Sequence, residues 1–233
     1  MIEIIEKFKN MTTLYTTKKT CSVCNIVSDQ TGISSTNEFG SPDLDTRPPE
    51  MKRSTINHWV ERCPHCGYCN STVENTEEGL EDIIYSSEYR SLLENKNYSE
   101  LTRSFLCQSY IYEYLGKLSA SIWSYIHAAW ACDDDKNKKG AQKCRIKAFE
   151  LIQKLWDQDK TLMEEKGGDY LLAADLLRRT EDYEKANKMI LGGFDVEAEG
   201  IIEELLNAQK KLVDSNIDLC YTMEDALKLV EKH

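Results

Sequence analysis

The stretch RCPHCGYCN, residues 62–70, carries three cysteines spaced three residues apart. An upstream stretch, TCSVCN at residues 20–25, carries another pair, so the pattern reads C-x2-C, a 38-residue spacer and C-x2-C-G. Two intervening residues allow both sulfurs of a pair to reach one ion, and two pairs supply the four thiolates that structural Zn²⁺ prefers. The sequence therefore predicts one structural zinc ion per chain, bound by Cys21, Cys24, Cys63 and Cys66.

Other interpretations of the cysteines remain open. Cys69 lies three residues after Cys66 and could replace it as a ligand, although we expect it to pack beneath the turn. His65 lies between two ligands and could also substitute, but we expect it to face water. A redox dithiol would open a helix after a buried strand, and an iron–sulfur cluster would need a fourth nearby cysteine followed by proline. The residues after Cys66 favour neither arrangement.

The predicted metal site has no coordination position left for water. Because four protein ligands complete a tetrahedron and leave no position for an activated water, a hydrolytic role of the ion is disfavoured. We therefore expect the metal to organise the fold, and we assign no catalytic residue and no organic cofactor. The sequence also lacks G-x-G-x-x-G, G-x-x-x-x-G-K-S/T and H-E-x-x-H. These observations disfavour an enzyme.

Composition favours a cytoplasmic protein. Nine cysteines are an odd number, and several fall within helical patterns, which argues against a disulfide framework. No apolar run approaches the length that crosses a bilayer, and residues 1–10 lack the apolar core of a secretory signal. We therefore expect a reducing compartment and no membrane contact.

The net charge of −11 is unevenly distributed. Residues 1–75 hold 8 basic and 9 acidic residues, a net charge of −1, whereas the remainder holds 21 and 31, a net charge of −10. Such an acidic chain lacks the positive field that draws proteins to phosphate backbones. Nucleic acid is therefore a disfavoured partner.

From about residue 78 the apolar residues follow helical periodicity. Residues 101–132 read as two helices separated at Gly116, and the Leu115–Gly116 step and Ala128 fit the 34-residue tetratricopeptide template. Residues 169–190 give a second, weaker match. The pairs Gly167-Gly168 and Gly192-Gly193 predict breaks between helices.

These patterns predict a mainly α fold with two domains. Residues 1–77 would form a zinc-ribbon-like module with short strands and a long loop between the cysteine pairs. Residues 78–233 would form a tetratricopeptide-like helical array, although an ordinary helical bundle remains an alternative. Helix pairs of the first kind leave a surface for partners.

The spacer between the cysteine pairs combines turn residues with a stiff centre at Arg47-Pro48-Pro49. Its tethered ends and apolar residues favour an ordered loop with Phe39, Leu44, Met51 and Trp59 as anchors. The stretches STNEFGSPDLDTRPPEMKRST (residues 35–55) and CPHCGY (residues 63–68), with Trp59, resemble an uncharacterised bacterial family. Its members pair a zinc-ribbon-like segment with a tetratricopeptide-like region, and the family implies no established activity. Cys69 departs from the small apolar residue expected there.

Three functions are compatible with these patterns. The leading hypothesis is a non-enzymatic adaptor in which zinc fixes the N-terminal module and the helical array binds a protein partner. The second is a nucleic-acid-binding zinc ribbon that contacts phosphate through Lys52, Arg53 and Arg62. The third is an enzyme that uses the loop Asp43–Thr55 and its surroundings, with four candidate residues: Asp43, Asp45, Arg47 and His58. The sequence does not indicate an oligomeric state.

Overall fold

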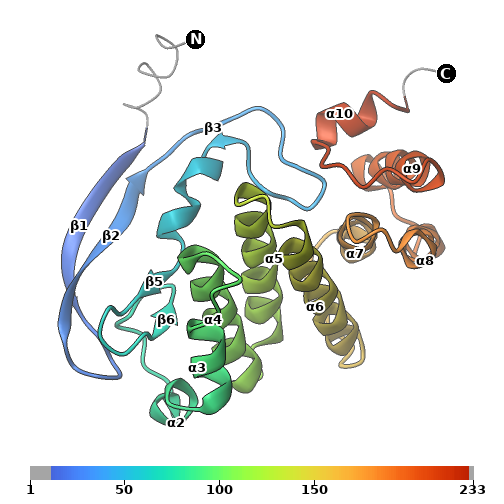
Figure 1. Cartoon of the computed structure of the whole chain (residues 1–233). Coiled ribbons are helices and arrows are strands. Elements are labelled where there is room, and N and C mark those ends of the chain that lie inside the picture. The colour runs from blue at the N-terminus through green and yellow to red at the C-terminus, as the bar shows by residue number, and fades with distance from the viewer. Residues whose placement is uncertain (1–11, 231–233) are drawn as a thin grey trace. The chain divides into compact units, whose positions relative to one another are not determined.

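The computed structural model describes residues 12–230, and the N-terminal stretch judged for a secretory signal lies outside this range (Figure 1). The described chain is mainly helical, with short two-stranded sheets confined to its N-terminal third. The predicted fold class, mainly α with a small strand region at the N-terminus, is confirmed. Among these residues, no helix combines the length and the apolar character that crossing a bilayer requires.

The chain forms two compact units, each built from two separate stretches. The first comprises the described residues up to Phe39 together with Pro49–Ala141. The second comprises Gly40–Pro48 together with the described residues from Gln142 onward. The backbone therefore passes between the units three times, whereas sequence periodicity indicates one boundary between residues 77 and 78.

Each cysteine pair lies at the tip of an antiparallel hairpin of the first unit (Figure 1). Strands β1 (Thr13–Thr20) and β2 (Val27–Ser35) form the longer hairpin, whose turn contains Cys21 and Cys24. Strands β5 (Glu61–Arg62) and β6 (Cys69–Asn70) form the shorter one, whose turn contains Cys63 and Cys66. The two C-x2-C pairs thus coincide with the turns of two hairpins.

The helices of the first unit follow the two hairpins. They are the 3-10 helix η1 (Arg53–His58) and the α-helices α2 (Leu80–Ile84), α3 (Ser87–Leu93), α4 (Glu100–Tyr114) and α5 (Leu118–Asp134). The side chain of Ser99 accepts the N–H of Thr102 and caps α4. Gly116 adopts a φ of 70° and forms the predicted turn between α4 and α5. Their shared core contains fully buried apolar side chains, among them Phe105, Ile111, Ile122 and Ile126.

The second unit is built on the C-terminal helices. Helix α6 (Lys138–Trp156) begins in the first unit and ends in the second, and α7 (Gly168–Arg178), α8 (Tyr183–Asp195), α9 (Ile201–Asp214) and α10 (Met223–Leu227) follow. Gly167 adopts a φ of 84° just before α7, so the first predicted glycine break is confirmed. The second is wrong, because Gly192 and Gly193 lie within α8. A Cβ on Gly193 would approach Leu206 of α9 to 2.7 Å, so these glycines allow close packing.

The excursion Gly40–Pro48 packs within the second unit. This segment follows strand β3 (Glu38–Phe39) and precedes strand β4 (Glu50–Met51), and the two strands pair with each other. Leu44 is buried in the core formed with α7–α10, and its N–H donates to the carbonyl of Tyr221 at 3.0 Å. The loop is therefore ordered through Leu44, as predicted, whereas the predicted anchor Phe39 is 49% exposed.

Candidate metal centre

The four predicted cysteines converge on one point. Their Sγ atoms all lie within 4.8 Å of one another, and the closest pairs, Cys21–Cys66 and Cys24–Cys63, are each 3.6 Å apart. Four sulfurs about 2.3 Å from a tetrahedral ion would lie about 3.8 Å from each other, which agrees with this spacing. The site is also sheltered, since three of the four cysteines are buried and Cys24 is partly buried. The group can hold a metal ion.

The two turns that carry the thiols share one backbone design. In the first, the N–H of Asn25 donates to the carbonyl of Cys21 at 2.9 Å, and in the second, the N–H of Gly67 donates to the carbonyl of Cys63 at 3.0 Å. The donor residue follows the second cysteine of its pair and has a positive φ, 56° for Asn25 and 80° for Gly67. Glycine and asparagine tolerate that conformation best. This repetition brings the two pairs face to face.

The environments of the thiols differ in their effect on ionisation. Burial raises the pKa of Cys21 and of Cys66. Burial acts in the same direction on Cys63, but backbone N–H groups of Cys66 and His65 and neighbouring thiols donate to its sulfur, so its pKa is lowered. A thiolate-binding cation must displace the protons that remain, so metal affinity at this site falls as pH falls.

Cys69 is not part of the sulfur cluster. It is fully buried, its thiol donates to the carbonyl of Gly67 at 3.3 Å, and its N–H donates to the hydroxyl of Tyr89 at 3.1 Å. The same hydroxyl donates to the carbonyl of Gly67 at 2.8 Å. Cys69 therefore packs beneath the turn, as expected from the sequence, and His65 is exposed outside the cluster.

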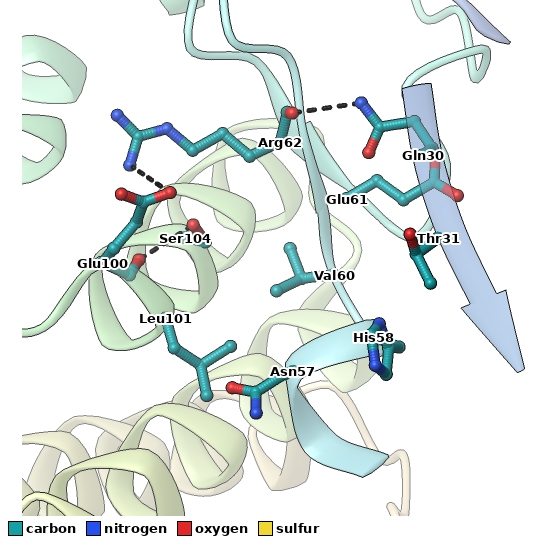
Figure 2. Close-up of a pocket in the computed structure, with 10 residues that line it drawn as sticks. All are labelled: Gln30, Thr31, Asn57, His58, Val60, Glu61, Arg62, Glu100, Leu101 and Ser104. Atoms are coloured by element: carbon teal, nitrogen blue, oxygen red, sulfur yellow. Dashed lines mark hydrogen bonds and ion pairs between the residues drawn. The ribbon is translucent and has the colours of Figure 1, made fainter. Parts of the chain in front are cut away.

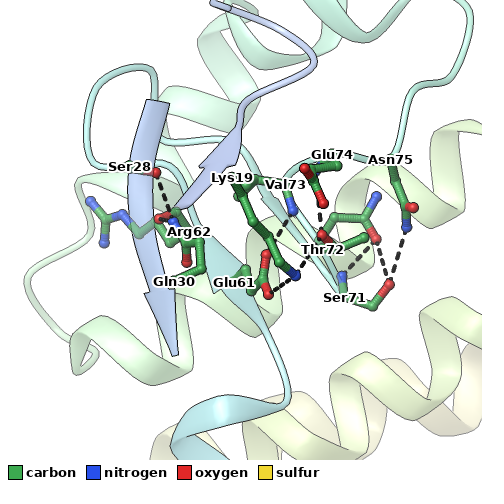
Figure 3. Close-up of polar contacts among 11 residues, drawn as sticks. Lys19, Ser28, Gln30, Glu61, Arg62, Ser71, Thr72, Val73, Glu74 and Asn75 are labelled. Atoms are coloured by element: carbon green, nitrogen blue, oxygen red, sulfur yellow. Dashed lines mark hydrogen bonds and ion pairs between the residues drawn. The ribbon is translucent and has the colours of Figure 1, made fainter. Parts of the chain in front are cut away.

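Contacts that the sequence did not reveal fasten the two hairpins to each other (Figure 3). Nζ of Lys19, beside the first cysteine pair, donates to Oε1 of Glu61 at 2.6 Å and to the hydroxyl of Thr72 at 3.0 Å. The second carboxylate oxygen of Glu61 accepts the N–H of Val73 at 3.0 Å. In the sequence Glu61 is visible only as an acidic residue two positions before Cys63, and most glutamates are solvated.

Two tyrosines connect the second hairpin to the helices. Tyr89 of α3 holds the turn at Gly67 and Cys69. Tyr112 of α4 donates its hydroxyl to Oδ1 of Asn70 at 2.7 Å, and Nδ2 of Asn70 donates to the hydroxyl of Tyr68 at 2.7 Å. The turn that carries Cys63 and Cys66 is therefore tied by hydrogen bonds to helices α3 and α4 of its own unit.

The candidate residues of the enzyme hypothesis fall into different units. Asp43, Asp45 and Arg47 belong to the excursion in the second unit, whereas His58 ends η1 in the first. Asp45 is fully buried, accepts from Arg179 at 2.8 Å and lies 3.8 Å from Arg145. These contacts give Asp45 a structural role in holding the excursion.

The candidate phosphate-binding residues are partly engaged with acids. Lys52 pairs with Glu38 at 2.7 Å, and Arg62 lies 3.8 Å from Glu100. Arg53 lies at the start of η1. Acids beside Lys52 and Arg62 reduce the positive charge that these two residues can offer to phosphate (Figure 2 shows Arg62 beside Glu100).

Comparisons of the chain with known protein families, with curated proteins and with solved structures found no match. The resemblance to the uncharacterised bacterial family and the tetratricopeptide-like assignment therefore stay predictions. Helices α4–α5 and α7–α8 do form successive pairs joined by short turns at the two stretches that gave those matches.

Proposed function

We propose that the chain is a zinc-stabilised protein-interaction module without catalytic activity. The observation that carries the zinc assignment is the closed group of four thiols, whose mutual distances of at most 4.8 Å suit one tetrahedral ion. A tetrathiolate site of this kind selects zinc or iron–sulfur chemistry among common metals. The hairpin-turn arrangement, with two residues between ligands, favours structural zinc.

The proposed role of the ion is structural. Cys21 and Cys24 would contribute ligands from the β1–β2 hairpin, and Cys63 and Cys66 would contribute ligands from the β5–β6 hairpin. Four protein ligands leave no position for substrate or water, so the ion would join the hairpins rather than activate a reactant. Bound zinc would supply folding free energy to a region whose strands bury few apolar side chains.

Protein binding by the helical array is the second part of the proposal. The acidic excess of the chain beyond residue 75 supports it, because 31 acidic and 21 basic residues fall there. Helix α9 buries one face and presents exposed acids, Glu203 and Glu204, in its first turn. An acidic helical surface favours a partner with a basic segment, and salt weakens such a contact.

The test is quantitative affinity capture from native cells with the full chain and two double variants. Glu203→Lys with Glu204→Lys reverses charge in the first turn of α9, and Glu81→Lys with Asp82→Lys makes the same change in the first turn of α2. We expect a salt-sensitive partner to be retained by the wild type and the α2 variant and lost by the α9 variant, with unchanged metal content. Retention by the α9 variant would contradict the proposed surface.

A further inference from the structure

A cavity of about 340 Å³ opens in the second unit, where the loop between α6 and α7 meets the end of α8. Its accessible lining is mainly apolar, and Trp156, Met163, Tyr170 and Val196 supply the large apolar side chains. All four of these residues are partly exposed. The volume lies at the lower end of the range for ligand pockets, and the lining suits an apolar group.

The carboxylate of Asp169, which is buried, holds one wall of the cavity in place. It accepts the indole N–H of Trp156 at 2.9 Å, the backbone N–H of Leu162 at 3.0 Å and that of Met163 at 2.6 Å. The rings of Trp156 and Tyr170 lie 5.0 Å apart between their centroids. These contacts fix the loop and the two aromatic rings before any ligand arrives, so binding would require little further ordering of the chain.

The connection between α8 and α9 lies beside the same loop. Gly167 has a φ of 84°, and a Cβ on it would approach the Cβ of Ala198 to 2.6 Å. Nζ of Lys166 lies 3.4 Å from the carboxylate of Glu197, and Val196 lines the cavity itself. The residues that follow α8 therefore form part of the surroundings of the cavity.

The exposed residues around the cavity are predominantly acidic. Residues 157–167 carry four acids and two lysines, and residues 195–204 carry five acids and no basic residue. The nine acids are all exposed: Asp157, Asp159, Glu164, Glu165, Asp195, Glu197, Glu199, Glu203 and Glu204. Two lysines offset only part of this charge, so the surroundings of the cavity attract a positively charged partner.

We propose that this cavity receives one apolar side chain from a segment of a partner protein, and that basic residues flank this side chain. The inference rests on the function proposed above, because it assigns the contact point of the partner within the helical array. Trp156, Met163 and Val196 would cover the apolar side chain, and lysine or arginine on either side of it would approach the exposed acids.

The charge of the surroundings favours this occupant over two others. A second copy of this chain, with its net charge of −11, would bring further negative charge against the acids. An uncharged small molecule would fill the cavity but would gain nothing from the acids around it. Burial of the apolar side chain and attraction of the basic residues depend on different features of the partner, so they can be measured separately.

The experiment is a fluorescence-anisotropy titration of the full metal-containing chain against short labelled peptides at low salt. Two probes consist of lysine and glycine with one central leucine or phenylalanine. Matched peptides replace the central residue with serine or all lysines with glutamine. We expect at least one probe to bind with a Kd below about 100 μM. Its serine analogue should bind at least about fivefold more weakly, and its glutamine analogue at least about tenfold more weakly.

Two double variants separate the cavity from the acids, and a third is the control. Met163→Ser with Val196→Ser removes apolar lining, so it should abolish the preference over the serine peptide and leave the affinity for that peptide within about twofold. Glu164→Gln with Glu165→Gln should weaken all lysine peptides about threefold and keep the preference. The control, Glu224→Gln with Asp225→Asn in the first turn of α10, should change each Kd less than about twofold.

The outcomes distinguish this inference from the proposed function. Equal affinity for lysine peptides with and without an apolar centre overturns the inference and leaves an acidic surface that binds a basic partner. Binding of the glutamine analogue as tightly as the probe assigns the cavity to an uncharged apolar ligand and overturns the inference. Absence of binding by both probes overturns it as well, whereas the capture assay above still decides the proposed function. The comparison of peptides on the wild-type chain is decisive by itself if a variant does not fold.

Discussion

Lys19 and Glu61 join the two hairpins that carry the cysteine pairs, with Nζ of Lys19 2.6 Å from Oε1 of Glu61. The side chains are 16% and 8% exposed, so the pair lies largely out of solvent. Lys19 precedes Cys21 by two residues and Glu61 precedes Cys63 by two residues. The ion pair therefore joins the two hairpins two residues before the first cysteine of each pair.

Lys19→Met should destabilise the protein more than the neighbouring Lys18→Met. The first change leaves the buried carboxylate of Glu61 without its cation, at a cost of about 2–3 kcal/mol. Lys18 pairs with Asp29 on the surface, with side chains 75% and 63% exposed, so its loss should change stability by less than about 0.5 kcal/mol. Urea unfolding of the two variants measures the difference in the free energy of unfolding. Equal losses would show that the buried ion pair stabilises the fold no more than the surface pair does.

Cys66→Ser and Cys69→Ser should have different effects on bound metal. Cys66 belongs to the sulfur cluster, so its variant should hold zinc far more weakly, with metal content well below one ion per chain. Cys69 contacts Gly67 and Tyr89 instead, so its variant should keep the ion and lose about 1–2 kcal/mol of stability. Elemental analysis of the purified chains distinguishes them. Equal metal loss would identify Cys69 as a ligand, and iron with visible absorbance would contradict zinc.

Alkaline pH should destabilise the first unit through Tyr68. Burial raises the pKa of Tyr68 to about 12, and its hydroxyl donates to the carbonyl of Asn75 at 2.8 Å. Because the unfolded chain loses this proton near pH 10, the contribution to stability is complete below that value and declines as pH rises toward 12. Urea unfolding between pH 9 and 11.5 should show a shallower decline for Tyr68→Phe than for the wild type. Parallel profiles would exclude Tyr68 as the titrating group.

Asp45→Asn should reduce the stability of the folded protein. The change removes the carboxylate charge that faces Arg179 at 2.8 Å and Arg145 at 3.8 Å in the second unit, at a cost of about 2–4 kcal/mol. Asp214→Asn is the matched control, because Asp214 pairs with Lys210 on the surface of α9. Chemical denaturation should separate the two variants. If Asp45→Asn were instead as stable as the control, the buried contacts would not hold the excursion.

The sequence predicted which four cysteines come together because the pattern that brings them together is local. Two residues between cysteines and a glycine after Cys66 define a turn, and Gly67 adopts the expected positive φ of 80°. The helical part was equally accessible, since apolar periodicity and Gly116 locate α4, α5 and the turn between them. Such features depend on neighbours a few residues away.

The features that the sequence did not reveal depend on distant partners. Glu61 looks like any surface acid until Lys19 and Val73 are brought to it by two separate hairpins. In the sequence Gly192 and Gly193 resemble a helix end. The residues that require glycine there, Tyr170 and Leu206, belong to other helices and pack closely against them. Arg62 is a candidate for phosphate contact from sequence, but only the fold places its guanidinium 3.8 Å from the carboxylate of Glu100.

The excursion Gly40–Pro48 affects the order in which parts of the chain can fold during synthesis. Its core partners in α7–α10 are made after both cysteine pairs, because ribosomes synthesise the chain from the N-terminus. The thiols can therefore meet while Leu44 and Asp45 still lack the groups that bury them. A truncated chain that ends at residue 77 would keep all four cysteines yet expose Leu44 to solvent and leave Asp45 without Arg145 and Arg179. The shortest fragment in which Gly40–Pro48 reaches its native surroundings extends to α10, where the N–H of Met223 donates to the carbonyl of Pro42 at 2.8 Å.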